Sequence, residues 1–215
     1  MSHGSEAIAA VAFPGTQGYE DEAPRLVARY EALAFDDKHG PVLALLPHAP
    51  GAVLDVGAGT GADAAWFAEQ GHRVVAVEPT RGLREAGRRL HSSPSILWLD
   101  DGLPALRSVH ALGRRFDAVM LTAVWMHIDA SERAVAMPGL AALVAPSGVL
   151  VLSLRHGPVP PGRRMFDVAA DETIALARAS GLDLVLHARN ESLQPENRAQ
   201  GVTWTRLAFR ADGTG

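Results

Sequence analysis

The residues best suited to chemistry lie in two short stretches, each at the end of an apolar run. The first is DVGAGTG (residues 55–61), an acid followed by three glycines at alternate positions. The second is Glu78, which ends the apolar run of residues 74–77. Glycines let the backbone approach a ligand closely, and a carboxylate at a strand tip can accept hydrogen bonds from both ribose hydroxyls. The pattern therefore predicts a site for a nucleoside-containing ligand.

Such a site needs a strand, a glycine turn, a helix and a second strand to position it. Residues 52–56 are apolar except for Asp55, residues 62–70 form a plausible helix that Gly71 closes, and residues 74–77 are apolar again. Buried parallel strands read as continuous apolar runs, and a helix start offers unpaired N–H groups. We expect the ligand to lie across the carboxyl ends of these two strands.

The rest of the chain continues the alternation of strands and helices. Further helices are predicted at residues 20–33, 42–46, 80–90, 104–112, 131–144 and 171–180, and further strands at 96–99, 116–121, 148–154, 182–188 and 202–209. The last two strands have no helix between them, so they should pair antiparallel. An α/β fold with a mostly parallel sheet follows from this order.

Two classes of nucleoside site remain open from these residues. The spacing Gly57-x-Gly59-x-x-Ala62, with Glu78 at about the expected distance, satisfies a loose dinucleotide fingerprint and allows a nicotinamide oxidoreductase. Asp55 is not part of that fingerprint, and its charge suits a ligand with a cationic amino acid end. The antiparallel ending is also not that of a dinucleotide domain, which sets the oxidoreductase second.

The run at residues 55–61 resembles motif I of the class I S-adenosylmethionine (SAM) methyltransferases. The stretches GADAAW (61–66), AVWMH (123–127) and LRHGP (154–158) look like those of bacterial members without a well-defined substrate. The resemblance covers the chain from about residue 42 onward. It implies a three-layer αβα sandwich around a Rossmann-like seven-stranded sheet, mostly parallel with an antiparallel C-terminal strand. It also implies SAM as cofactor and S-adenosylhomocysteine as product.

The resemblance also assigns site residues. The acid after the second strand would hold the ribose, an acid after the third would meet the adenine amino group, and the end of the fourth strand would lie beside the methyl group. The expected cofactor residues are Asp55, Gly57, Ala58, Gly59, Gly61, Asp63, Glu78, Pro79, Asp100, Asp101, Gly102, Leu103, Thr122 and Ala123.

Residues expected on the acceptor side follow strand ends or lie in the N-terminal cover. His127 and His156 follow predicted strands and titrate near neutral pH, so they are candidate general bases, with Arg155 beside them as the third catalytic candidate. The candidate acceptor-binding residues are Tyr19, Tyr30, His39, Trp125 and Arg164. Residues 1–47 are expected to form cover helices over the pocket, and residues 48–215 the SAM-binding unit of a single structural domain.

Composition limits the remaining classes. The chain has 215 residues, a net charge of −4, no cysteine and one lysine, Lys38, among its 20 cations. No basic block predicts nucleic-acid binding, no histidine pair has metal-ligand spacing, and no apolar run of about 20 residues predicts a membrane span. Residues 1–12 lack the pattern of a signal peptide. We expect a cytoplasmic monomer or homodimer that methylates O or N of a small molecule, without a metal; a SAM-binding protein without turnover is the other alternative.

Overall fold

The computed structural model describes residues 13–211. Its strands are β1 (Ala52–Val56), β2 (Arg73–Val77), β3 (Ile96–Leu99), β4 (Phe116–Leu121), β5 (Val144–His156), β6 (Leu182–Glu191) and β7 (Thr203–Ala211). Its α-helices are α1 (Tyr19–Glu31), α2 (Phe35–His39), α3 (Ala62–Glu69), α4 (Arg81–Leu90), α5 (Arg107–His110), α6 (Ala130–Leu143), α7 (Ala170–Ala179) and α8 (Pro195–Ala199), with 3₁₀ turns η1 (Gly40–Leu45) and η2 (Trp125–His127). The expectation for residues 1–12 lies outside the described residues.

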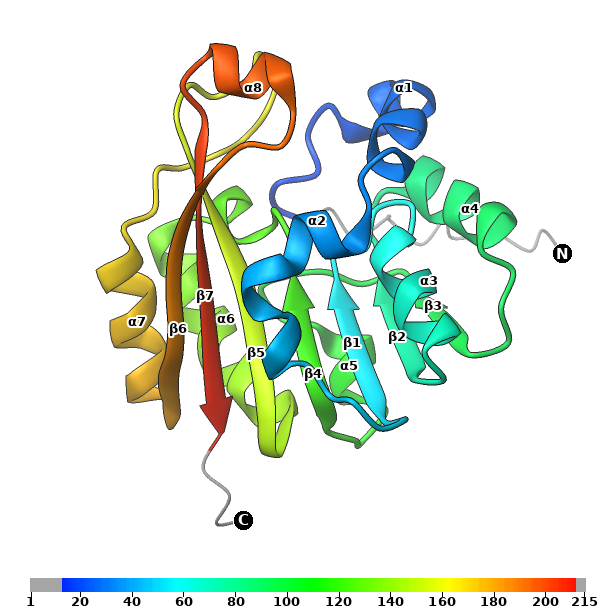
Figure 1. The fold of residues 1–215 in the computed structure, drawn as a ribbon, viewed down its shortest axis with the longest axis vertical. Coiled ribbons are helices and arrows are strands. Elements are labelled where there is room, and N and C mark those ends of the chain that lie inside the picture. The colour runs from blue at the N-terminus through cyan, green and yellow to red at the C-terminus, as the bar shows by residue number, and fades with distance from the viewer. Residues whose placement is uncertain (1–12, 212–215) are drawn as a thin grey trace, which may run out of the picture.

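The seven strands form one sheet in the order β3-β2-β1-β4-β5-β7-β6. The pairs from β3 to β5 are parallel, whereas β7 runs antiparallel to both β5 and β6. The predicted seven-stranded sheet with one antiparallel C-terminal strand is confirmed. The parallel strands therefore all end at the same edge, where the glycine loop begins (Figure 1).

Each face of the sheet is covered by its own apolar layer. On one face, α2, η1 and α3 pack through Phe35, Val42 and Phe67 against alternate residues of the central strands. On the other face, α5, α6 and α7 pack through residues such as Val109, Met137 and Ile174. Because both faces of β1 and β4 are buried, these strands read in the sequence as unbroken apolar runs. The expected three-layer αβα arrangement is confirmed (Figure 1).

The structure differs from the predicted elements where local pattern was weak. The helix expected at residues 104–112 is only α5, and the Leu106 that precedes it has a left-handed backbone with φ 44°. The short helix α2 was not expected, and α8 lies inside a stretch that was expected to be a polar loop. Strand β5 is longer than expected at both ends, since its pairing with β7 continues to His156.

Candidate active site

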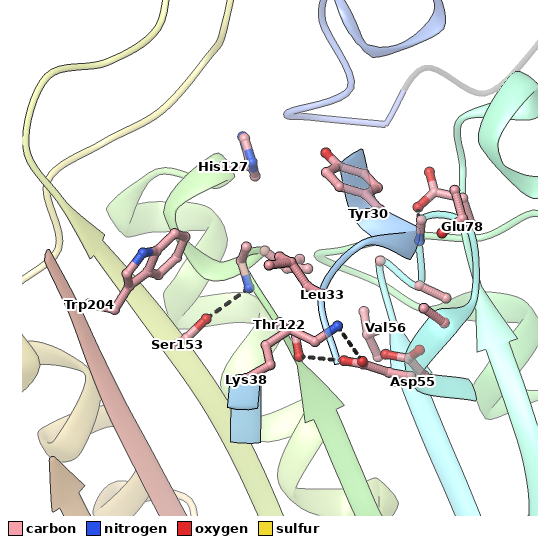
Figure 2. A pocket seen from close by; sticks show the side chains of 18 of the residues that line it. Tyr30, Leu33, Lys38, Asp55, Val56, Glu78, Thr122, His127, Ser153 and Trp204 are labelled. Carbon is pink, nitrogen blue, oxygen red and sulfur yellow. Dashed lines mark hydrogen bonds and ion pairs between the residues drawn. The ribbon is translucent and has the colours of Figure 1, made fainter. Parts of the chain in front are cut away.

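A cavity of about 440 Å³ opens at the carboxyl edge of the sheet. Its floor is the glycine loop and the ends of β1, β2, β4 and β5. The α1 helix and the β6–β7 connection with α8 contribute to its walls and stand over this edge in Figure 1. Figure 2 shows Glu78 and Asp55 on one side of the cavity and His127, Ser153 and Trp204 on the other.

Fourteen of the residues expected to bind cofactor or acceptor, or to act in catalysis, line this cavity. They are Tyr19, Tyr30, Asp55, Gly57, Ala58, Gly59, Asp63, Glu78, Pro79, Gly102, Leu103, Thr122, Ala123 and His127. The fold therefore brings predicted site residues from β1, β2, β4 and the N-terminal cover together around one cavity.

The backbone conformation and close contacts of the glycine loop leave no room for side chains at Gly57 and Gly59. Gly57 and Gly59 have φ of 68° and 57°, which L-residues rarely adopt. A Cβ on Gly57 would collide with the Val124 side chain, and one on Gly59 would come within 3.3 Å of the Tyr30 ring. The bare backbone therefore forms part of the cavity floor. Gly61 does not line the cavity, because it packs against the Trp98 ring instead.

Glu78 is fixed in the cavity wall by backbone donors. Its carboxylate accepts hydrogen bonds from the N–H of Gly59 at 2.8 Å and the N–H of Thr80 at 2.7 Å. The side chain is buried, and burial raises the pKa of the Glu78 carboxyl against the lowering by these bonds. Each carboxylate oxygen keeps a further lone pair, so Glu78 can accept two ligand hydroxyls.

A second acidic cluster lies at the end of β1. Asp63 forms ion pairs with Lys38 at 2.5 Å and with His39 at 2.8 Å, and the Thr122 hydroxyl donates to it at 3.2 Å. These partners lower the pKa of Asp63 despite its burial.

The neighbouring Asp55 has the opposite shift. Burial, followed by the charge of Asp63, raises the pKa of Asp55 well above its ordinary value. Its Oδ2 atom is buried and has no hydrogen-bond partner within residues 13–211. A buried oxygen without a partner is costly, so this atom suits a ligand that brings a donor.

The acids after β3 point away from the cavity. Asp100 forms an ion pair with Arg84 at 2.8 Å. Asp101 is buried, and its oxygens accept the backbone N–H groups of Gly102, Ser108 and Val109. Neither side chain lines the cavity, although the neighbouring Gly102 and Leu103 do. At the end of β3 the cavity is therefore lined by Gly102 and Leu103, at the place where a carboxylate was expected to accept a hydrogen bond from the adenine amino group.

His127 is held in one tautomer at the end of β4. Its Nδ1 lies 2.8 Å from the carbonyl oxygen of Arg164 and its Nε2 lies 3.0 Å from the Tyr19 hydroxyl. A carbonyl can only accept, so Nδ1 carries the proton and Nε2 accepts from Tyr19. Burial, with smaller contributions from Arg163 and Arg155, lowers the pKa of His127. The ring is therefore neutral at neutral pH and has a basic nitrogen directed at Tyr19.

The other candidates for the acceptor side lie outside the cavity lining. His156 contacts Thr205 at 2.9 Å and Asp167, whereas Arg155 donates to the carbonyls of Gly157 and Pro158.

Trp125, His39 and Arg164 are held by structural contacts. Trp125 is fully buried and donates to Thr173, and His39 is buried against Asp63. Arg164 pairs with Asp129 and Glu132 and donates to the His127 carbonyl. These contacts support the site rather than form its surface.

Many lining residues were not expected, among them Lys38, Ser153, Trp204 and Arg206. Lys38 is the only lysine of the chain, and this could have drawn attention to it as a site residue. The short α2 helix that places it in the cavity was not predicted from the sequence. Trp204 and Arg206 alternate with buried residues of β7. Alternation puts both side chains on the same face of β7, but that this face borders the cavity could be inferred only once β7 was known to pair with β5.

Comparison with known proteins agrees with this geometry. A family model described as a methyltransferase domain matches residues 24–200. The N-methyltransferase NodS from Bradyrhizobium japonicum, solved with S-adenosylhomocysteine, superposes with a TM-score of 0.65 at 16% identity, over 89% of this chain and 99% of that chain. A Burkholderia thailandensis 1,6-didemethyltoxoflavin-N1-methyltransferase superposes with a TM-score of 0.61 at 22% identity, over 98% of each chain.

Fold and family model together define a class I SAM-dependent methyltransferase. The chain belongs to the methyltransferase domain family, whose cofactor is SAM. Rat glycine N-methyltransferase is 29% identical over an alignment 154 residues long, and the match covers 58% of this chain and 50% of that protein. The match thus spans about half the length of that curated relative. Family membership also removes the reason to keep the nicotinamide oxidoreductase as an alternative.

Proposed function

We propose that this protein transfers the methyl group of SAM to an oxygen or nitrogen of a small-molecule acceptor. One observation carries the proposal: a single cavity joins a glycine loop flanked by Asp55 and Glu78 to the neutral, oriented imidazole of His127. The first part suits an adenosine joined to an amino acid, and the second suits an acceptor that must lose a proton.

The residues on the β1–β2 side fit the cofactor. Glu78 would accept the ribose hydroxyls, the unpaired Oδ2 of Asp55 would accept the ammonium group, and Lys38 would pair with the carboxylate. The bare backbone of Gly57 and Gly59 leaves room for close approach. When bound, SAM supplies an activated methyl group on a positively charged sulfur.

The residues on the β4 side would position the acceptor and take its proton. An acceptor O–H or N–H that donates to the Tyr19 oxygen lets Tyr19 pass its own proton to His127 Nε2. Burial raises the pKa of Tyr19, which keeps the phenol protonated and able to serve as such a donor. Exclusion of water and correct orientation supply the remaining acceleration, which for well-oriented reactants can reach about 7–11 kcal/mol.

The cover of the cavity is part of the same proposal. Arg163 stacks over the Tyr19 ring at 3.8 Å and pairs with Glu22, and Arg29 contacts Gln194 of the β6–β7 connection. We propose that residues 1–47 act as a cover that closes over bound ligands, and residues 48–215 as the SAM-binding unit. No helix within residues 13–211 is both long and apolar enough to span a membrane.

Several finer points belong to the proposal rather than to the family. A small-molecule acceptor is supported by the size of the cavity, about 440 Å³, and by the acceptor named for the Burkholderia thailandensis neighbour. The net charge of −4 and the absence of a basic block support a protein that does not bind nucleic acid. We further propose a cytoplasmic, bacterial enzyme that is a monomer or homodimer.

The test combines calorimetry and turnover. Titration with S-adenosylhomocysteine should show saturable binding at one site, and NAD should show none. Incubation with methyl-labelled SAM and a panel of phenols, amines and carboxylates should then give a labelled small product. Saturable NAD binding without SAM binding would refute the proposal, and SAM binding without any methylated product would support a binding protein without turnover.

A further inference from the structure

The end of the cavity furthest from Glu78 has its own chemistry. We call it the β7 compartment and define it by Ser153, Asn190, Leu193, Asn197, Trp204 and Arg206. Strand β7 lies three places from β1 in the sheet order, beyond β4 and β5. Figure 2 accordingly shows Trp204 and Ser153 opposite Glu78 and Asp55. A cofactor held by the glycine loop and Glu78 leaves this compartment for the acceptor.

Arg206 brings a positive charge that the described chain does not pair. Its guanidinium makes no hydrogen bond or ion pair within residues 13–211, and the side chain is only partly exposed. Burial lowers the pKa of Arg206, and Asp63 is the charge that opposes this shift. Asp63, however, already holds Lys38 and His39 by direct contacts. A cation removed from water without a partner is unfavourable, so this site favours an anionic ligand.

Trp204 supplies a flat surface next to that charge. It is partly buried, it lines the same cavity, and its indole N–H has no partner within the described part of the chain. Residues 204 and 206 lie on the same face of β7 because side chains alternate along a strand. Two residues span about 7 Å along a strand, which is close to the length of a one-ring carboxylate.

The remaining residues of the compartment are compatible with an anionic, one-ring ligand and add no carboxylate that would favour a cationic ligand instead. Ser153 is buried and accepts the backbone N–H of Ala123 at 2.8 Å, and its own hydroxyl can still donate to an anionic ligand. Asn190 and Asn197 are neutral, and Leu193 is apolar. Glu191, at the end of β6, and Arg198, in α8, are exposed lining residues of the cavity and carry opposite charges, which leaves Arg206 as the positive charge of the compartment.

We propose that the acceptor is an aromatic or heteroaromatic carboxylate, with its ring on Trp204, its carboxylate on Arg206 and its nucleophilic oxygen or nitrogen toward His127. This inference rests on the proposed function for its reaction. The acceptor's O–H or N–H proton passes by way of Tyr19 to His127. The nucleophile bonds to the methyl carbon, and the departing sulfur keeps the electron pair of the broken bond.

The test measures binding, so it needs no knowledge of the natural acceptor. Benzoate, benzamide and cyclohexanecarboxylate are titrated by calorimetry into the protein with and without saturating S-adenosylhomocysteine. We expect benzoate to bind at least tenfold more tightly than benzamide, which lacks the charge. Cyclohexanecarboxylate, which lacks the flat ring, should bind more weakly than benzoate. Equal binding of benzoate and benzamide would overturn the proposal.

Variants assign the effect to Arg206. Arg206→Gln should weaken benzoate at least tenfold while S-adenosylhomocysteine binding stays within twofold, and Arg206→Lys should keep part of the benzoate affinity. The matched control is Arg210→Gln, because Arg210 lies on the same strand but contacts Ser147 outside the cavity. Circular dichroism and melting temperature establish that each variant is folded.

The outcomes separate this inference from the proposed function. If Arg206→Gln weakens S-adenosylhomocysteine instead of benzoate, the guanidinium holds the cofactor and the proposal fails. Equal effects of Arg206→Gln and Arg210→Gln would also refute it. If the protein does not bind S-adenosylhomocysteine at all, the proposed function fails, and the titrations without that ligand still decide whether Arg206 binds carboxylates.

Discussion

At the β1–β2 end of the cavity, nearly every group that faces the ligand comes from residues 52–80, whereas at the β7 end the groups come from segments far apart in the chain. Asp55, the glycine loop and Glu78 follow one another through one strand–helix–strand unit. Ser153, Asn190 and Arg206 meet only because β7 inserts antiparallel between β5 and β6. The residues of the β1–β2 end can be predicted from one continuous stretch of sequence. Those of the β7 end can be predicted only when the pairing of the strands is known.

The two ends of the cavity also differ in the kind of ligand that their side chains suit. The β1–β2 end has fixed carboxylates, each with backbone or side-chain contacts, and fits one ligand common to the whole family. The β7 end has the Arg206 guanidinium, which has no partner within residues 13–211, and the Trp204 indole, both on β7 itself, beside the β6–β7 connection that carries α8. Under the proposals above, cofactor binding depends on the parallel core of the fold, whereas acceptor choice depends on the β6–β7 hairpin.

The largest expected effect lies where the two ends meet. His127→Asn should lower kcat about 100-fold or more for acceptors that lose a proton, because positioned general bases contribute about that much. S-adenosylhomocysteine affinity should stay within a few-fold. Steady-state kinetics and calorimetry measure the two quantities, and Tyr19→Phe is the companion variant, which removes only the hydroxyl. A kcat within threefold of the unaltered protein would contradict a proton-accepting role.

The same histidine predicts a pH dependence. The pKa of folded His127 is lowered below its ordinary value of about 6.5, so its neutral form persists as the pH falls through 6.5. Turnover should thus stay level from pH 7.5 to 6.5 and decline only at lower pH. A profile that is already half lost at pH 6.5 would show that burial does not lower this pKa.

The next effect belongs to the β1–β2 end. Glu78→Gln should weaken S-adenosylhomocysteine by about 1.5–3 kcal/mol, roughly ten- to a hundredfold, because hydrogen bonds to a charged acceptor are lost. Calorimetry measures it, and Glu85→Gln is the control, because Glu85 pairs with Arg81 on the surface. An unchanged affinity would show that Glu78 does not hold the ribose.

A smaller effect should accompany cofactor binding at Asp55. Its raised pKa favours the protonated form in the free protein, and a ligand ammonium beside it would lower that pKa. Between the two pKa values, binding of S-adenosylhomocysteine should release up to about one proton. Calorimetry in buffers of different ionisation enthalpy measures the release, and Asp55→Asn should abolish it. The same proton release in Asp55→Asn would assign it to another group.

The smallest effect is expected at a histidine only one strand away. His156→Gln should change kcat and acceptor affinity by less than about twofold, because His156 lies outside the cavity and contacts Thr205. Steady-state kinetics beside His127→Asn gives the comparison directly. A tenfold loss of kcat would place His156 back among the catalytic residues.

The contrast between these two histidines shows what sequence can and cannot predict. Both follow predicted strands, so both were candidates from the sequence. Strand β5, however, continues to His156, and alternation sends neighbouring side chains to opposite faces of a sheet. Ser153 therefore lines the cavity while His156 turns to the other face. The limits of a strand decide this, and they are the least reliable part of a sequence-based prediction.

The same reasoning explains the success at β1, β3 and β4. Each is a parallel strand whose limits coincide with those of a largely apolar run, and all three have the predicted bounds. The predicted end of β2 at Val77 is also confirmed, and parallel register of β1 and β2 brings Asp55 and Glu78 to one edge. Lys38 and Arg206 could not be predicted in this way, since their positions depend on the packing of α2 and the pairing of β7.

The single lysine makes this protein open to a chemical measurement. Lys38 carries the only side-chain amine, and its Nζ lies within the cavity beside Asp63. A reagent that acylates side-chain amines has therefore one target, and that target lies where ligands bind. The rate of acylation, followed by mass spectrometry, would count the fraction of molecules with a filled cavity without any engineered label.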